Sequence, residues 1–120
     1  MKKKQIGLNY KRKRIEFEVN FVPRRLHWLG LMFSRKKKAE ALLFEFDKLV
    51  KMPIHSCFVF YNFYAIWLDE NFNFIEGKVV NPFRLSVSPK KKFKYLIEVP
   101  ITKNYDGIIK LLVGEKETFK

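Results

Sequence analysis

The sequence contains a single cysteine, Cys57, and this scarcity excludes the disulfide-stabilised class of small proteins. One thiol cannot form an internal disulfide, so the fold must be held together by its own hydrophobic core. The chain is long enough for such a core, because 120 residues fall within the usual size of one domain. We therefore expect a single domain over residues 1–120, and the cysteine usage fits a reducing compartment.

The chain also lacks a long apolar run. The longest mostly apolar stretch covers residues 54–68, whereas a membrane-spanning helix needs about 20 apolar residues. The N-terminal residues MKKKQIGLNYKRKR carry positive charge without the apolar segment that a secretory signal peptide requires. We predict no membrane span and no signal peptide, and hence a cytoplasmic protein.

Acidic residues are scarce relative to basic ones. Twelve Asp and Glu face 25 Lys and Arg, so ion pairing cannot neutralise the excess and the net charge is +13. A surface this basic attracts polyanions through long-range fields. Two interpretations follow: a solvated basic surface, or a binding site for a polyanion such as RNA or DNA. The candidate polyanion-binding residues form three runs: Lys11, Arg12, Lys13 and Arg14; Arg35, Lys36, Lys37 and Lys38; and Lys90, Lys91 and Lys92.

Aromatic residues, in contrast, are abundant, with 13 Phe, five Tyr and two Trp. Many of them lie in residues 54–71, IHSCFVFYNFYAIWLDEN, together with Val and Ile. These residue types favour strands over helices. We therefore predict two consecutive buried strands at about 55–61 and 63–69, followed by a turn at 69–71.

Alternation of apolar and polar residues predicts a β-hairpin near the N-terminus. Apolar residues occupy positions 6, 8 and 10, and again 15, 17, 19 and 21, with polar residues between them. The turn then falls on the basic run 11–14, although neither Gly nor Asn marks it. This charge would belong to the folded domain and not to a loose arm.

The remaining sequence predicts further short elements. We expect helices at 24–29, ended by Gly30, and at 106–112, ended by Gly114. We expect strands at 41–46 with a connector over 47–53, at 72–80 with an interruption at 76–77, and at 93–99, with shorter pieces at 85–88 and 117–119. Together these elements predict a mainly β fold, a small β-barrel or sandwich with one or two short helices.

Three segments, in this order, resemble the domain of unknown function 192 family of archaeal and bacterial proteins. The first is GLMF at 30–33 with the apolar strand after it, the second runs from Ile54-His55 to Leu68-Asp69, and the third is KYLIEVP at 94–100. Gly114-Glu115 is similar to the closing Gly-Asp of the family. The resemblance covers residues 6–115 and implies a small, mainly β fold with short helices. It implies no established activity.

The chain departs from the family pattern inside the second segment. Asn62, Phe63 and Tyr64 stand where the family has Pro-Ile-Asp, and Ser56 stands where many members have Met. The acid of that segment is one of the few candidate functional groups of the family, and the phenol of Tyr64 replaces it. If the acid does chemistry or binds a cation in relatives, we expect that this chain does not do the same.

The sequence offers little for a metal site or for catalysis. Apart from the methionines, the soft metal ligands are His27, His55 and Cys57, whereas zinc needs three or four ligands at recognisable spacing. Phosphate-binding loops and serine-nucleophile motifs are absent. We therefore predict no metal, no cofactor and no catalytic residue, and we favour a non-enzymatic protein.

Two hypotheses about function remain. In the first, the protein is a binding module whose basic runs engage a polyanion such as nucleic acid, with Tyr10, Phe83 and Phe93 as stacking partners. In the second, a small-ligand or catalytic pocket lies at the strands of residues 54–69. Its candidate mouth residues are His55, Asn62 and Tyr64.

Overall fold

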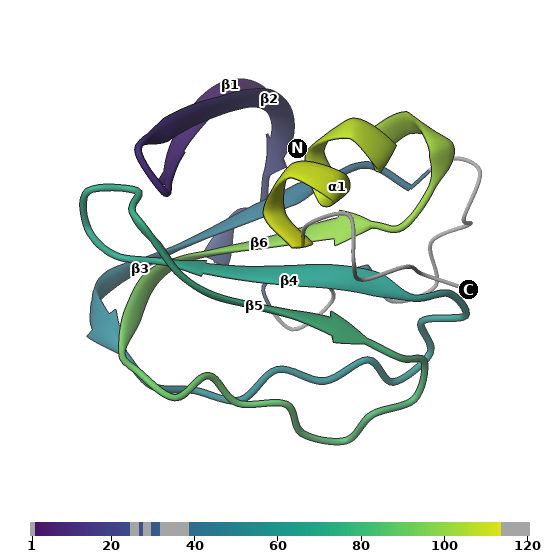
Figure 1. The fold of residues 1–120 in the computed structure, drawn as a ribbon. Coiled ribbons are helices and arrows are strands. Elements are labelled where there is room, and N and C mark those ends of the chain that lie inside the picture. Colours follow the sequence, from purple (N-terminus) through teal and green to yellow (C-terminus); the bar gives the residue numbers. More distant parts are fainter. Residues whose placement is uncertain (1, 25–26, 28–29, 32–38, 114–120) are drawn as a thin grey trace.

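The computed structural model describes residues 2–24, 27, 30, 31 and 39–113, and it confirms the mainly β prediction. Six strands form one mixed sheet in the order β1-β2-β3-β6-β4-β5 (Figure 1). Neighbouring strands pair antiparallel, except for β2 and β3, which pair parallel. The strands are β1 (Lys2–Tyr10), β2 (Lys13–Phe21), β3 (Leu42–Val50), β4 (Phe63–Leu68), β5 (Phe74–Val80) and β6 (Phe93–Pro100). A 3-10 turn, η3 (Lys103–Tyr105), leads into the helix α1 (Asp106–Val113).

The N-terminal hairpin is confirmed, and its turn is unusual in composition. β1 and β2 pair antiparallel from Lys2 opposite Phe21 to Tyr10 opposite Lys13. The two residues of the turn, Lys11 and Arg12, both have positive φ, at 46° and 67°. This is the geometry of a type I′ turn, which Asn-Gly normally occupies. The register places the turn on the basic run, as the sequence predicted.

The sheet curls until its two outer strands touch, which makes it a half-barrel. The Asn9 backbone N–H donates to the Phe72 carbonyl at 2.9 Å, and an isolated bridge joins Asn9 to Asn73, the residue before β5. The Asn9 amide also donates to the Asn73 side-chain oxygen at 3.0 Å. These bonds connect the first strand of the sheet with the last one near the hairpin turn.

The sheet has a hydrophobic core on each face, and β4 belongs to both. Its side chains alternate: Tyr64, Ile66 and Leu68 enter the first core, which the hairpin and α1 cover. Phe63 and Trp67, both fully buried, enter the second core on the other face. Two loops that run side by side below the sheet in Figure 1 cover this second core. We call residues 51–62 and 81–92 the loop pair.

The predicted strand at 55–61 is wrong, whereas the one at 63–69 is confirmed as β4. Residues 57–58 form a turn in which Phe58 has φ of 59°, a left-handed conformation that ends any strand. Only Ile54 forms a bridge in this loop, with Val87 in the predicted edge piece at 85–88. Hydrogen bonds of the buried Ser56 link the two loops in place of regular strand pairing. Its backbone and its hydroxyl bond the facing loop at Asn81, Phe83 and Arg84.

The other elements follow the predictions with shifts in extent. β3 continues through part of the predicted connector to Val50, with an irregularity after Glu45. β5 runs through Glu76 and Gly77, so the predicted interruption there is wrong, and it ends before Asn81 as expected. β6 and α1 confirm the predicted strand at 93–99 and the predicted helix at 106–112. The predicted helix at 24–29 lies largely outside the described residues. Three other predicted features lie entirely outside them: the basic run 35–38, Gly114 and the strand at 117–119.

Among the described residues, no helix has both the length and the apolar character needed to cross a membrane.

Candidate functional site

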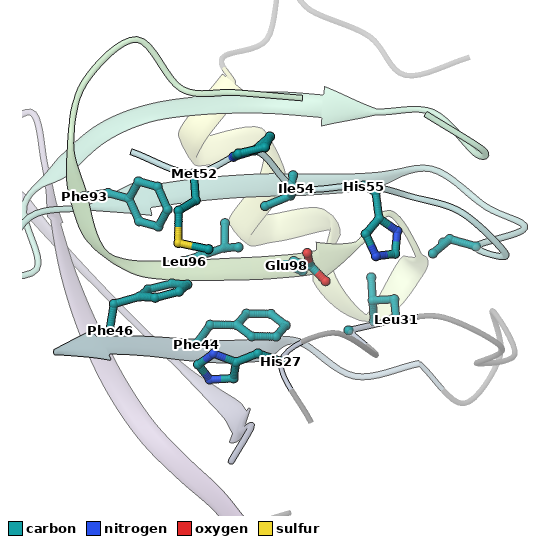
Figure 2. Close-up of a pocket in the computed structure, with 13 residues that line it drawn as sticks. His27, Leu31, Phe44, Phe46, Met52, Ile54, His55, Phe93, Leu96 and Glu98 are labelled. Atoms are coloured by element: carbon teal, nitrogen blue, oxygen red, sulfur yellow. The ribbon is translucent and has the colours of Figure 1, made fainter. Parts of the chain in front are cut away.

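A cavity of about 360 Å³ lies between the second-core face of the sheet and the first loop of the pair. β3 and β6 supply one wall, and residues 52–55 and 59 of the loop supply the other (Figure 2). Residues 27, 30 and 31 close a third side. The wall is mainly apolar, with these side chains among its members: Leu31, Phe44, Phe46, Ile54, Phe93 and Leu96. Its size falls within the range of small-molecule sites.

The carboxyl group of Glu98 lines this cavity. β6 is a central strand, and Glu98 pairs with Leu42 of β3 on one side and Ala65 of β4 on the other. The residue is only 5% exposed. Burial raises the pKa of Glu98 to about 8, although the backbone N–H of Leu31 donates a hydrogen bond that acts in the opposite direction. At neutral pH the group is therefore largely a neutral carboxylic acid, which both donates and accepts hydrogen bonds.

Gly30 makes room for this carboxyl group. Its φ is +50°, a conformation that favours glycine. A Cβ atom at this position would lie 3.1 Å from Oε1 of Glu98, tighter than an ordinary contact. The absence of a side chain thus permits both the backbone turn and the close approach of the acid.

Two histidines add polar atoms to the apolar wall. The ring of His27 packs edge-on to Phe44 and tilted to Phe46, each at 5.3 Å between centroids, and its Nε2 lies 3.2 Å from the Val22 carbonyl. Burial lowers the pKa of His27, the carbonyl of Val22 raises it, and the charge of Arg24 lowers it. The net direction is down, so the neutral imidazole is favoured.

His55 has a defined hydrogen-bonding role in the loop. Its Nδ1 accepts the backbone N–H of Cys57 at 3.2 Å. In the neutral ring the proton then resides on Nε2, which is a donor. In Figure 2 the His55 ring lies on the same side of the cavity as Leu31 and Glu98. The cavity therefore has a carboxyl group, an imidazole donor and a second imidazole in an otherwise apolar wall.

Of the three predicted mouth residues, the structure brings only His55 to the cavity. Tyr64 points into the first core on the opposite face of β4, where it is 3% exposed. A Cβ atom on Gly77 of β5 would collide with its hydroxyl, so the glycine accommodates the phenol. Asn62 is half-buried just before β4, and its carbonyl accepts the N–H of Ile101 at 3.1 Å.

The two basic runs that the structure describes flank different cores. The turn of the run 11–14 lies beside the first core, where Tyr10 packs edge-on to Phe74 at 4.8 Å. The run 90–92 leads into Phe93 of the second core, and the Lys90 N–H donates to Glu76 at 2.8 Å. The two runs therefore lie on different elements, the hairpin turn and the loop before β6.

The predicted stacking partners differ in exposure. Phe93 is fully buried and Tyr10 is half-buried, so neither presents an open ring, whereas Phe83 is 52% exposed. Among the described residues, no group of three or more His, Cys, Asp and Glu side chains is placed to hold a metal ion.

The sequence reasoning missed Glu98 and the role of Gly30. In the segment FKYLIEV, Lys94 and Glu98 lie on the same face of an alternating strand. The acid therefore resembles an ordinary solvent-facing residue of a half-exposed strand. One feature of the sequence indicates that Glu98 is buried. It lies between Ile97 and Val99 near the end of the strand, and Leu96 makes the other face of the strand apolar as well. All three segments that carry the family resemblance contribute to the cavity, through residues 30 and 31, 54 and 55, and 96 and 98.

The comparisons with known proteins point to uncharacterised archaeal relatives. No family profile matches the chain. It is 31% identical over 72 residues to a UPF0127 protein of Pyrococcus horikoshii, a match that covers 60% of this chain and 62% of that protein. This is less than two thirds of the relative. UPF0127 proteins of Pyrococcus abyssi and Pyrococcus furiosus are 28% and 29% identical over 86% and 84% of this chain, and 83% and 79% of their own lengths.

Two solved structures share the fold. A protein from Sinorhizobium meliloti, described as a candidate transcription regulator, has a TM-score of 0.72 and 12% identity over 89% of this chain and 86% of its own. A protein of unknown function from Novosphingobium aromaticivorans has a TM-score of 0.68 and 10% identity over 87% of this chain and 76% of its own. At such identities the likeness concerns the fold alone. The chain is thus a mainly β domain similar to uncharacterised proteins.

Proposed function

We propose that the protein binds a small, mostly apolar molecule in the cavity, and that Glu98 anchors the one polar group of this ligand. The observation that carries the proposal is a buried carboxyl group in the wall of an apolar cavity. Burying a polar group costs free energy unless it is hydrogen-bonded, so such a group is a candidate for a functional role. A largely apolar cavity with a few convergent polar groups is the usual form of a small-molecule site.

The chemistry of the wall restricts the ligand. Apolar surface near Phe44, Ile54 and Leu96 supplies affinity at roughly 25 cal/mol per Å² of buried apolar area. A neutral Glu98 can donate a hydrogen bond to a carbonyl or hydroxyl oxygen of the ligand, and an ionised Glu98 can pair with an amine. Among the described residues, no ion pair includes Glu98, so its carboxyl group has no cationic partner of the protein to compete with a ligand. Binding is the activity we propose for this cavity.

The test is a thermal-shift screen of small apolar compounds that each carry one carbonyl, hydroxyl or amine group. Met52 lines the cavity and is 47% exposed, so Met52→Trp can fill the space without disturbing the sheet. Leu111→Trp on α1, at a site 51% exposed and away from the cavity, is the matched control. We expect hits whose affinity falls at least ~10-fold in Met52→Trp and is unchanged in the control. Hits that bind both variants equally would refute the proposal.

We further propose that the chain is a single domain of the domain of unknown function 192 family. The three segments of the resemblance support this assignment, and so does their convergence on one cavity. The similarity to UPF0127 proteins supports membership in an uncharacterised family of this kind. A cytoplasmic location stays a prediction from the sequence.

Polyanion binding is a second candidate function, and the net charge of +13 favours it. The loop pair carries exposed basic residues next to exposed aromatic rings. Binding to heparin or to an oligonucleotide, measured by fluorescence anisotropy, should weaken steeply as salt concentration rises, because bound counterions are released. Affinity that does not change with salt would remove this candidate.

A further inference from the structure

We propose that the loop pair is a binding surface for single-stranded nucleic acid, in which Phe58, Phe60 and Phe83 stack on bases while neighbouring cations contact phosphates. This inference rests on the second candidate function, polyanion binding, and names its partner and its site. It is independent of the cavity ligand.

The two loops form one continuous surface. Ile54 and Val87 exchange two backbone hydrogen bonds of 2.8 Å, and the N–H of Ser56 donates to the Arg84 carbonyl at 2.8 Å. The Ser56 hydroxyl accepts the Arg84 N–H at 2.6 Å and donates to the Asn81 carbonyl at 2.5 Å. Figure 1 shows the loops running side by side below the sheet. The surface is therefore held by hydrogen bonds and not by a regular ladder.

Three phenylalanines cluster at one end of this surface. Phe58, Phe60 and Phe83 are 48%, 64% and 52% exposed. The ring of Phe83 meets the other two edge-on, at 6.2 Å from Phe58 and 5.2 Å from Phe60 between centroids. Apolar rings are usually placed in the core, so a contacting trio at the surface suggests a partner with flat apolar faces. Nucleic-acid bases have such faces.

The backbone presents two of these rings in a costly conformation. Phe58 and Phe83 both have φ of 59°, a left-handed region that bulky residues rarely adopt. The backbone N–H groups of Phe83 and Val59 donate to the Ser56 carbonyl at 2.9 Å and 3.1 Å, which holds the chain at Phe83 and directly after Phe58. Strain that neighbouring contacts maintain is commonly found at functional sites.

The charge of the loop pair complements a phosphate backbone. Residues 51–62 and 81–92 contain no Asp or Glu. Their basic side chains are all exposed: Lys51, Arg84, Lys90, Lys91 and Lys92. The pairing of Val50 with Phe93 brings the first loop's Lys51 next to the second loop's lysine run.

The arrangement favours a single strand over a duplex or a membrane. The aromatic trio lies near the start of the second loop, and the lysine run lies at its end, beside β6. A strip with rings and Arg84 at one end and lysines at the other can follow an extended backbone, and its rings can reach bases only when these are unpaired. A membrane-inserting tip would instead surround its apolar side chains with the cations.

The experiment measures binding of the full chain to a fluorescent ten-nucleotide single strand, to the matching duplex, and to vesicles that contain anionic lipid. We expect tighter binding to the single strand than to the duplex. Phe60→Ala, at an ordinary backbone position, and Phe83→Ala should each weaken single-strand binding by at least ~5-fold. Leu111→Ala, at a comparably exposed apolar site, should leave it unchanged.

A matched pair of charge variants locates the phosphate contacts. The triple variant Lys90→Gln, Lys91→Gln and Lys92→Gln should weaken binding. It should also make the negative slope of log affinity against log salt shallower by up to ~2. The triple variant Lys2→Gln, Lys3→Gln and Lys4→Gln in β1 removes the same charge elsewhere and should have a much smaller effect. Circular dichroism of each variant verifies that the fold is retained.

Several outcomes would overturn the inference. Equal losses in the two triple variants would mean diffuse attraction to charge. Equal affinity for duplex and single strand, with no effect of the phenylalanine variants, would leave polyanion binding in place and remove this site. Absence of binding to any oligonucleotide or to heparin would remove both polyanion binding and this site. Binding to anionic vesicles alone would identify the surface as a membrane contact.

Discussion

Glu98 is the residue on which the proposed function depends. It lies in a central strand of the sheet with apolar neighbours on both faces, and it is 5% exposed. A carboxyl group at such a position shifts toward its neutral form, because ionisation in a low-dielectric site is costly. An apolar residue would pack there at no such cost, which is why the acid indicates function.

The raised pKa of Glu98 predicts that stability falls as pH rises. The pKa is about 8 in the folded state and near 4.5 otherwise, so the folded state holds a proton that the unfolded state releases between these values. The contribution of Glu98 to stability is fully present below pH ~4.5, declines up to pH ~8 and is then constant, a total change on the order of 5 kcal/mol.

Glu98→Gln isolates this contribution, because the amide does not titrate and keeps an oxygen for the Leu31 N–H. Urea unfolding at several pH values should show the variant gaining stability over the wild type between pH 5 and 8, by an amount on the order of a few kcal/mol at the upper end. The difference between the two proteins removes the opposite trend from His27, whose pKa is lowered. A pH-independent difference would contradict the buried neutral acid.

At the scale of elements, the hairpin turn carries a removable strain. Lys11 and Arg12 occupy the two positive-φ positions that Asn and Gly prefer. The double variant Lys11→Asn and Arg12→Gly should raise the free energy of unfolding by ~0.5–1.5 kcal/mol. Thermal melting provides the measurement, with an expected rise of several degrees. An unchanged or lower melting temperature would mean that the basic residues stabilise the turn in another way.

Ser56 is the main polar link of the loop pair. It is fully buried, and its hydroxyl bonds Asn81 and Arg84 across the two loops. Ser56→Ala removes both bonds, so we expect a loss of ~1–3 kcal/mol in the free energy of unfolding. Ser86→Ala, at an exposed position of the facing loop, is the control and should change little. Hydrogen exchange at the Arg84 amide should accelerate in the first variant only.

Element by element, the sequence predicted what depends on local pattern. The alternation around residues 6–21 was sufficient for the hairpin, and so was the apolar run of β4. The pattern at 55–61 failed, because aromatic and β-branched residues favour a strand whether they are buried in a sheet or lie in a loop that covers it. The left-handed backbone of Phe58 and the hydrogen bonds of Ser56 depend on the facing loop, which no local window contains.

At the scale of the whole molecule, the curvature of the six-stranded sheet determines where the candidate site lies. The half-barrel leaves a cavity on its second-core face. His55 was identified from the sequence because it lies near the apolar block. Glu98 and His27 reach the same cavity only through the pairing of β6 with β3 and the return of the chain before β3, and such long-range contacts leave no local pattern.

We expect a small apolar ligand to bind next to Glu98. A carbon-13 NMR titration of the glutamate carboxyl groups, with a compound that raises the melting temperature, tests this expectation. We predict that the Glu98 resonance titrates near pH 8 in the free protein and shifts when the ligand saturates the site, while the exposed Glu16 and Glu18 do not shift. Saturation that leaves the Glu98 resonance unchanged would contradict the account.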